Sequence, residues 1–348
     1  MTPKSATRLL LAGLLFAPGC ATRHGPRTMA NVRASYNEAV SKSADEQMLL
    51  NIVRLRYLHS TTFLQLSSVV TQYAWTANAG VNGAYNPGAA APFPAANAGG
   101  SAGLAVTERP TITYTPLQGE EFVQRLATPL SAEHVLLLMR AGWGADLILN
   151  TCVHQINDVF APYAASREGS DPFHRLADLL HELQRTHELS VEQLRGPAAK
   201  TVITVRRQAD GTRSEEAHEA LGLLGLSEDV DHYPVTGAMV PHLPGTIEIR
   251  ARSVLGTMFH LSQGVQVPAS DPAARELPTP VDAPRLVVAS SERAPKDAYV
   301  QVKYRDRWFF IDEADYRSKR AFVMLTFLFN LASAPAGSGP VLTVGASG

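Results

Sequence analysis

Charged side chains are absent from a long internal stretch of this chain. From Ser60 to Thr107 there is no Asp, Glu, Lys, Arg or His, although Asp, Glu, Lys and Arg make up 18% of the 348 residues. At that frequency, about eight or nine charged residues are expected in a stretch of this length. Charge is depleted where a surface is covered by protein or by lipid. The stretch therefore predicts a covered surface, with an inert surface loop as the alternative.

The same stretch predicts a β-hairpin arm. Residues 61–75 and 105–115 are rich in β-branched and aromatic side chains, whereas 16 of the 28 residues from Thr76 to Gly103 are Ala or Gly. The Gly/Ala-rich part buries too little apolar surface to offset its ordering entropy, which predicts a loop over 76–103. Apolar and polar residues do not alternate cleanly in 63–75. We therefore favour packing of the arm on sister subunits over insertion into the bilayer.

Residues 1–19 have the pattern of an export signal. Lys4 and Arg8 precede an apolar block over 9–16, which is too short to span a membrane, and small residues then lead to Cys20. The pattern resembles the bacterial lipoprotein signal, in which the cysteine is acylated and the preceding peptide removed; an ordinary cleaved signal is the alternative. The resemblance implies a lipid at Cys20. Because Ala21 stands where an aspartate marks inner-membrane retention, it also implies the outer membrane, facing the periplasm.

Charge and cysteine content exclude two classes of protein. Without residues 1–19 the chain has 29 basic and 32 acidic residues, a net charge of −3. It therefore has no basic footprint for nucleic acid. Once Cys20 is acylated only Cys152 remains, so no intramolecular disulfide can form. Cys152 lies in an apolar run, which predicts a buried structural thiol.

The pattern of apolar residues predicts an α+β fold. We expect a polar tether over 20–42 and an amphipathic helix over 43–57, followed by the arm up to residue 116. The segment 117–195 is predicted to be helical, with helices at 119–127, 131–141, 145–160 and 171–187. The segment 200–348 is predicted to mix strands at 201–207 and 246–250 with helices at 215–224 and 253–263, and to contain a Pro-rich loop over 266–284.

The C-terminal part has the clearest pattern. Strands are predicted at 298–304 and 307–312, joined by a tight turn at Arg305-Asp306. Asp312 is expected to cap the next helix, whose apolar run over 321–332 is too short to cross a membrane. A last strand over 340–344 is expected to return to this sheet. The predicted architecture is an N-terminal helix and β-hairpin arm, a helical middle, and a C-terminal mixed sheet with packed helices.

Three stretches resemble an uncharacterised family of proteobacterial envelope lipoproteins. They are Glu46–Tyr57 (EQMLLNIVRLRY), Pro116–Phe122 (PLQGEEF) and Tyr304–Lys319, which surrounds Trp308–Asp312 (WFFID). The resemblance covers most of the chain after the signal. It implies an envelope lipoprotein and brings no known activity with it.

Two motifs could carry chemistry. Gly99–Gly103 (GGSAG) matches the nucleophile elbow of serine hydrolases, but the strand before Ser101 and the helix after it that this motif requires are not predicted. His181 and His187 are six residues apart and cannot share a metal on one helix face. His174, Asp178 and His181 are better spaced as ligands. A Gly-rich loop and a solvated helix face are the favoured interpretations of the two motifs.

The sequence therefore predicts no catalytic, cofactor-binding or metal-binding residue, and Cys20 is its one proposed site, for lipid attachment. The favoured function is a membrane-tethered structural or assembly subunit without catalytic activity. Its expected partners are membrane lipid at Cys20 and, through the arm over 60–107, further copies or another envelope protein. The alternative is a periplasm-facing enzyme or small-ligand-binding protein with a site in the helical middle, around Trp143 and the histidines. A charged turn at Arg305–Arg307 beside Trp308 could contact a partner, although such turns are more often solvated.

Overall fold

The computed structural model describes residues 24–85, 96–162, 172–194, 200–237, 243–277, 284–333 and 341–346. The predicted α+β class is confirmed, because the chain combines helices with three separate sheets. It divides into two compact units. The first contains residues 1–61 and 127–329, and the second contains residues 62–126 and 330–348.

The first unit begins with the long helix α2, His24–Arg56. Its C-terminal third carries a buried apolar stripe, which consists of Met48, Leu49, Ile52 and Val53. Side chains over 33–44 are exposed apart from that of Tyr36. The predicted helix start at Ser43 was therefore wrong, and the predicted tether over 20–42 is helical from His24 onward. Because the described side chains over 33–44 are exposed apart from that of Tyr36, packing gives no reason to expect a helix there.

A six-stranded mixed sheet forms the centre of the first unit. Its strand order is β4-β3-β8-β7-β6-β5, in which only β7 and β8 are parallel. The strands are β3 (Val153–Ile156), β4 (Val159–Phe160), β5 (Leu189–Leu194), β6 (Lys200–Val205), β7 (His232–Thr236) and β8 (Ile247–Ala251). Buried Tyr233, Ile247 and Ile249 are among the side chains through which this sheet contributes to the core.

Five helices accompany this sheet. They are α4 (Ala132–Arg140), α5 (Ala145–Cys152), α6 (Pro172–Arg185), α7 (Glu215–Leu223) and α8 (Val254–Ser262). Ser131, Ser214 and Ser253 cap three of them, each accepting a hydrogen bond from the backbone N–H three residues later. Helix α5 packs on α6 and α8, and α6 packs on α7.

The predicted helix over 145–160 ends at Cys152, and residues 153–160 form the hairpin β3–β4 instead. Asn157 adopts a positive φ of 47° in the turn. Its side chain accepts from the Glu248 backbone N–H at 2.8 Å and donates to the Leu224 carbonyl at 2.8 Å. Pairing with β8 thus overrides the helical pattern, because the β-branched residues after Cys152 gain a strand partner.

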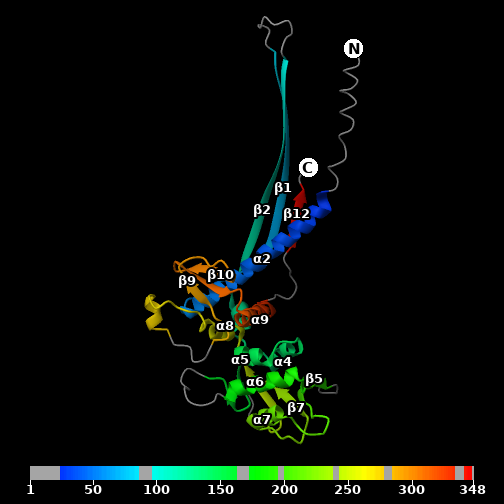
Figure 1. Ribbon diagram of the computed structural model, residues 1–348, viewed down its shortest axis with the longest axis vertical. Coiled ribbons are helices and arrows are strands. Elements are labelled where there is room, and N and C mark those ends of the chain that lie inside the picture. The colour runs from blue at the N-terminus through cyan, green and yellow to red at the C-terminus, as the bar shows by residue number, and fades with distance from the viewer. Residues whose placement is uncertain are drawn as a thin grey trace. The chain divides into compact units, whose positions relative to one another are not determined.

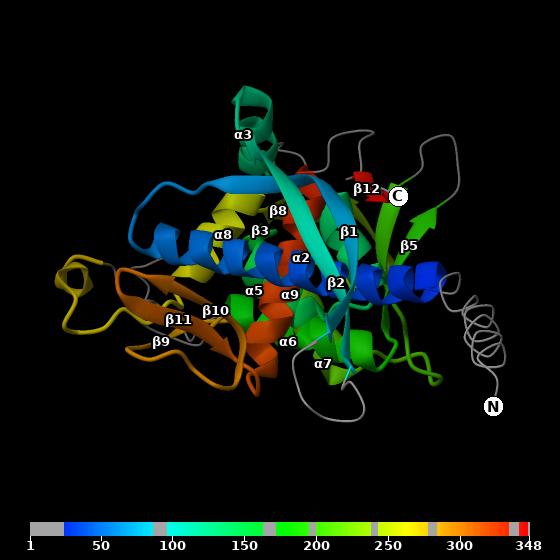
Figure 2. The same ribbon diagram turned by 90° about the horizontal axis from the view of Figure 1, so that it is seen from above.

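A second, three-stranded antiparallel sheet has the order β10-β11-β9. Its strands are β9 (Ala289–Ser291), β10 (Ala298–Tyr304) and β11 (Arg307–Asp312). Figure 2 shows it beside α2 and the helix α9, Tyr316–Ser333. The tight turn is confirmed, since Arg305 and Asp306 both have positive φ, as a type I′ turn requires.

Helix α9 buries much of its predicted apolar run, including Phe322, Met324 and Leu325. The predicted cap was wrong: Asp315 accepts from the Ser318 backbone N–H at 3.0 Å, whereas Asp312 accepts from that of Ala314, before the helix. Within the Pro-rich loop over 266–284, one short 3-10 helix, η1 (Pro272–Arg275), is formed. Residues 278–283 lie outside the described part.

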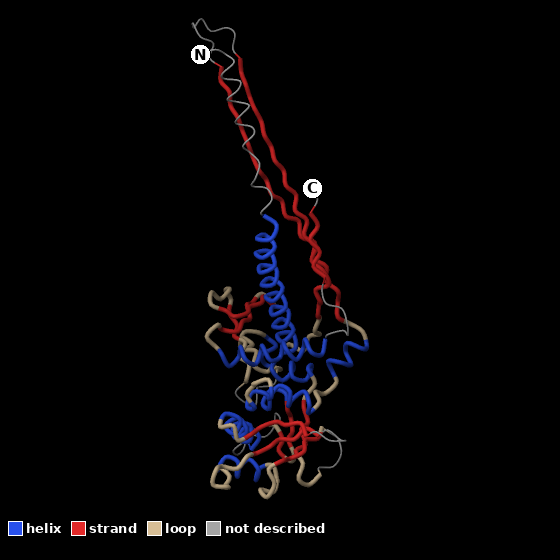
Figure 3. The backbone as a smooth tube through the Cα atoms, turned by 90° about the vertical axis from the view of Figure 1, so that its right-hand side faces the viewer, coloured by secondary structure: helices blue, strands red, loops and turns tan. Residues whose placement is uncertain are grey.

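The second unit contains a three-stranded sheet of order β12-β1-β2 and the helix α3, Glu120–Ala127. Strand β1 spans Phe63–Tyr85 and pairs antiparallel with β2, Ala96–Leu117. Strand β12, Val341–Ala346, runs parallel to β1 (Figure 3). The last strand was thus predicted in nearly the right place but in the wrong sheet.

The predicted loop over 76–103 was also wrong in extent. Strand β1 continues to Tyr85 and β2 starts at Ala96, so only residues 86–95 of that segment lie outside the description. Ala and Gly have low strand propensity. The antiparallel pairing nevertheless continues from the β-branched residues near Phe63 into the Gly/Ala-rich part.

Candidate functional site

Strands β1 and β2 form the candidate interaction surface, which we call the arm. The register runs from Phe63 opposite Leu117 to Tyr85 opposite Ala96, with one irregularity between Leu66 and Ser68 (Figure 1). At about 3.4 Å per residue, two strands of this length extend over about 75 Å. The predicted hairpin is therefore much longer than the pattern of β-branched residues indicated.

The outer part of the arm has no charged residue. Twelve consecutive pairs, from Ala74 opposite Thr107 to Tyr85 opposite Ala96, are uncharged. The first charged residues are Glu108, opposite Tyr73, and Arg109, opposite Gln72. The residues without charge in the sequence thus form one continuous uncharged segment on two paired strands, 74–85 and 96–107.

The two edges of the arm differ. On the β1 side, β12 pairs with Ser68–Tyr73 and the pairing ends there. From Ala74 to Tyr85, β1 is an edge strand, and β2 is an edge strand over its whole length, within the sheets that the structure describes. An edge strand presents backbone N–H and C=O groups to which another strand can add.

Apolar side chains are exposed at the base of the arm. Ile112 and Tyr114, two residues apart on the same face of β2, are 47% and 46% exposed. Phe63 is buried, and its ring lies 6.0 Å from that of Phe122 in α3 in an edge-to-face arrangement. Helix α3 thus covers one end of the arm and leaves Ile112 and Tyr114 accessible.

A two-stranded hairpin is at best marginally stable in water. Among the described residues, three strands pair at Ser68–Tyr73, and the outer twelve pairs form a two-stranded ribbon. Its backbone polar groups and its neutral side chains are compatible with a covering partner, because no charge has to be desolvated. The arm therefore has the properties of a surface that is buried by association.

The histidines of α6 contact α5. His174 Nδ1 contacts Asn150 Oδ1, and His181 Nδ1 lies 3.4 Å from Asp146 Oδ1. No group of three or more potential metal ligands occurs in the described ranges. The set His174, Asp178 and His181 is thus not brought together as a metal site, and two of its members join neighbouring helices.

The loop around Trp143, where an enzyme or binding site was the alternative, is held by Gln184. The Gln184 side chain donates to the Trp143 carbonyl at 3.0 Å and accepts from the Ala145 backbone N–H at 2.9 Å. A Cβ at Gly144 would lie 2.5 Å from Asp146 Oδ1 and 3.0 Å from His181 Cε1. Gly144 thus permits a close packing of these side chains, and the contacts are those of a structural junction.

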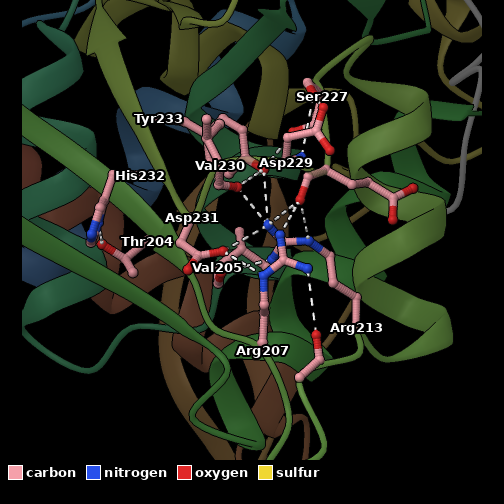
Figure 4. A network of polar contacts seen from close by, with 12 residues as sticks. Thr204, Val205, Arg207, Arg213, Ser227, Asp229, Val230, Asp231, His232 and Tyr233 are labelled. Atoms are coloured by element: carbon pink, nitrogen blue, oxygen red, sulfur yellow. Dashed lines mark hydrogen bonds and ion pairs between the residues drawn. The ribbon is translucent and has the colours of Figure 1, made fainter.

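Figure 4 shows a network of polar contacts around Arg213. Its guanidinium is 3% exposed and donates to the carbonyls of Val205 at 2.8 Å and Glu228 at 3.0 Å. It also lies 3.0 Å from Asp231 Oδ1. Its donors are directed mainly at backbone carbonyls, so Arg213 holds the loop before β7 in place and is not directed at a ligand. No local sequence signal distinguishes it from other arginines.

The charged turn at Arg305–Arg307 is not simply solvated. The Arg305 guanidinium lies 5.0 Å from the centre of the Tyr57 ring and 3.7 Å from Asp271 Oδ1. The Tyr57 hydroxyl donates to Asp271 Oδ2 at 3.0 Å. Burial raises the pKa of Tyr57 to about 12, and the bond to Asp271 contributes. This cluster joins the end of α2, the Pro-rich loop and the β10–β11 turn.

The remaining predicted residues have simple placements. Ser101 lies within β2, opposite Gly80, so the strand–turn–helix geometry of a nucleophile elbow is absent around it. Cys152 is fully buried, and burial raises the pKa of its thiol to about 12. The predicted structural thiol is confirmed. Cys20 and the signal over 1–19 lie outside the described residues.

In the described part of the chain, no helix has the length and apolar content needed to cross a membrane. Comparison with models of known protein families, with curated proteins and with solved structures found no match.

Proposed function

We propose that this protein is a lipid-anchored envelope protein that acts as an assembly subunit, without catalytic activity, through its arm. The observation that carries the proposal is the uncharged segment of twelve strand pairs, Ala74–Tyr85 with Ala96–Thr107. A two-stranded ribbon is at best marginally stable alone in water. Association with further copies covers them at no cost in desolvated charge.

The proposed anchor is a lipid on Cys20. The basic start, the short apolar block and the small residues before Cys20 support it. Each buried lipid methylene contributes about 0.8 kcal/mol, so two or three acyl chains hold a protein on a membrane stably. The outer membrane, with the protein facing the periplasm, is the proposed location.

The size of the native particle tests the assembly role. The full-length, lipid-modified protein is extracted in mild detergent, and its mass is measured by light scattering after size exclusion. We expect an oligomer, and we expect a variant lacking residues 76–103 to be a monomer with an unchanged helical circular dichroism signal. A wild-type monomer, or a deletion variant of the same oligomeric state, contradicts the proposal.

The anchor is tested separately. Cells that express the protein are labelled with radioactive palmitate, and Cys20→Ser is the matched control. We expect label in the wild type and none in the variant. Equal label in both would show that another residue is modified, and absence of label from the wild type would remove the anchor.

A further inference from the structure

The outer arm has two edges, one on each strand. One is the β1 edge over Ala74–Tyr85, and the other is the β2 edge over Ala96–Thr107, which is its register partner. In the described part of the chain, β12 pairs with Ser68–Tyr73 of β1, and no strand pairs with the outer side of β1 over Ala74–Tyr85 or of β2 over Ala96–Thr107. The charged residue nearest to these edges is Glu108, opposite Tyr73. Both edges without a described partner thus lie in the uncharged part of the arm.

From this coincidence we infer that the arm assembles by head-to-tail strand addition. The β1 edge of one copy, Ala74–Tyr85, pairs antiparallel with the β2 edge, Ala96–Thr107, of a second copy. The inference rests on the proposed assembly role and adds its geometry to it. The resulting sheet alternates β1 and β2 from successive copies and continues the antiparallel pairing within each arm.

Two-fold pairing of like edges is disfavoured. If β2 paired antiparallel with β2 of a second copy, each copy would cover only one of its two edges. If β2 paired parallel with β2, the arms would point the same way but both β1 edges would stay uncovered. Head-to-tail contacts can cover every edge once the set of copies closes.

The size of the contact sets the conditions for assembly. Twelve residues extend over about 40 Å, and with a thickness of about 10 Å one edge buries about 400 Å² on each copy. The total of about 800 Å² for one contact is below the roughly 1,200 Å² of the smallest stable standard interfaces. A pair of copies in solution is therefore weak. Two contacts per copy in a closed set of copies make up the difference.

Cross-linking tests the head-to-tail pairing in membranes that hold the full-length protein. Each variant carries one added cysteine in the arm. Asn78 on β1 and Gly103 on β2 lie opposite each other, both are exposed, and a Cβ at Gly103 would contact nothing within 4 Å. Copies with Asn78→Cys are expressed together with differently tagged copies with Gly103→Cys. A bifunctional maleimide that reaches about 7 Å tolerates a shift of two residues in register. Native Cys152 is buried and remains in all variants.

We expect a cross-linked pair that carries both tags when the two variants are mixed. Each variant alone is expected to give no more product than the wild-type chain. Asn78→Cys mixed with Ala209→Cys, an exposed position in the first unit, is the matched control and is also expected to give no product.

The outcomes separate this inference from the function on which it rests. A product from either variant alone, or no mixed product from a protein whose oligomer is lost when 76–103 is deleted, overturns head-to-tail pairing and leaves the assembly role intact. If deletion of 76–103 does not change the oligomeric state, the assembly role fails and the inference fails with it.

Discussion

Tyr85 lies opposite Ala96 at the far end of a register whose first pair is Phe63 and Leu117. The pairing between them continues through a segment in which Ala and Gly predominate and charge is absent. Composition of this kind gives little local preference for a strand. A long ribbon built from such residues is best explained by a covering surface, which we propose to be the arms of further copies.

The Arg213 network leads to a prediction about stability. Replacing Arg213 by Ala removes a nearly buried guanidinium and its bond to the Val205 carbonyl, while the Glu228 carbonyl still accepts from Arg207. We expect Arg213→Ala to lower the free energy of unfolding by about 3 kcal/mol. Urea denaturation followed by circular dichroism measures the change.

Arg207 is the matched control for that variant. It also lies near Asp231, at 3.1 Å, but its side chain is 36% exposed. Because exposed ion pairs contribute little to stability, Arg207→Ala is expected to lower the free energy of unfolding by less than about 1 kcal/mol. If the two substitutions lowered the free energy of unfolding equally, burial of Arg213 would not determine how much it stabilises the fold.

The Tyr57 hydroxyl leads to a prediction about pH. Its pKa in the folded state, about 12, lies above the ordinary value of 10.0, so the folded state favours the neutral phenol. The resulting stabilisation is fully present below the unfolded-state pKa and is lost as the pH rises toward the folded-state pKa. Tyr57→Phe is expected to lower the free energy of unfolding by about 1 kcal/mol at about pH 8, because the bond to Asp271 is lost. Near pH 12 the decrease is expected to be smaller.

Unfolding of Tyr57→Phe and of the wild type is compared in urea at both pH values. Tyr114→Phe removes an exposed phenol and serves as the control. We expect Tyr114→Phe to change the free energy of unfolding at pH 8 by less than about 0.5 kcal/mol, because its side chain is exposed. A difference between Tyr57→Phe and the wild type that stays constant with pH would show that the phenol does not titrate as described.

Cys152 leads to a prediction about reactivity. Its thiol is fully buried with a pKa of about 12, so the reactive thiolate is scarce at neutral pH and inaccessible. In a Cys20→Ser background, a maleimide is expected to label no thiol in the native protein and one thiol in denaturant, as measured by mass spectrometry. Stoichiometric labelling of the native protein would contradict the structural role of Cys152.

The sequence was most informative where local chemistry determines the structure. The strands at 298–304 and 307–312 and the turn at Arg305-Asp306 follow from short-range patterns, and the structure has them where they were predicted. The C-terminal half of α2, predicted over 43–57, also follows from a local apolar pattern. The absence of charge from 60 to 107 was visible as well, although it does not specify two strands that reach Tyr85 and Ala96.

Long-range pairing accounts for what the sequence did not predict. Val341 of β12 pairs with Ser68 of β1. No short window contains that information. The helix expected over 145–160 is cut at Cys152 because residues 153–156 pair with β8, about 95 residues later. The contacts of Tyr57 with Asp271 and Arg305 likewise join three distant segments.

A charge placed on the outer arm tests the central claim most directly. Asn78 is exposed in β1 and lies in the uncharged segment, so Asn78→Lys adds one charge and Asn78→Gln keeps the position neutral. A covered charge without a partner costs several kcal/mol, and each 1.4 kcal/mol weakens association about tenfold. Light scattering of the detergent-extracted, full-length protein is predicted to find the wild-type oligomer for Asn78→Gln and an association at least about tenfold weaker for Asn78→Lys. An Asn78→Lys protein that keeps the wild-type oligomer at every concentration would contradict the claim that the arm is covered by further copies.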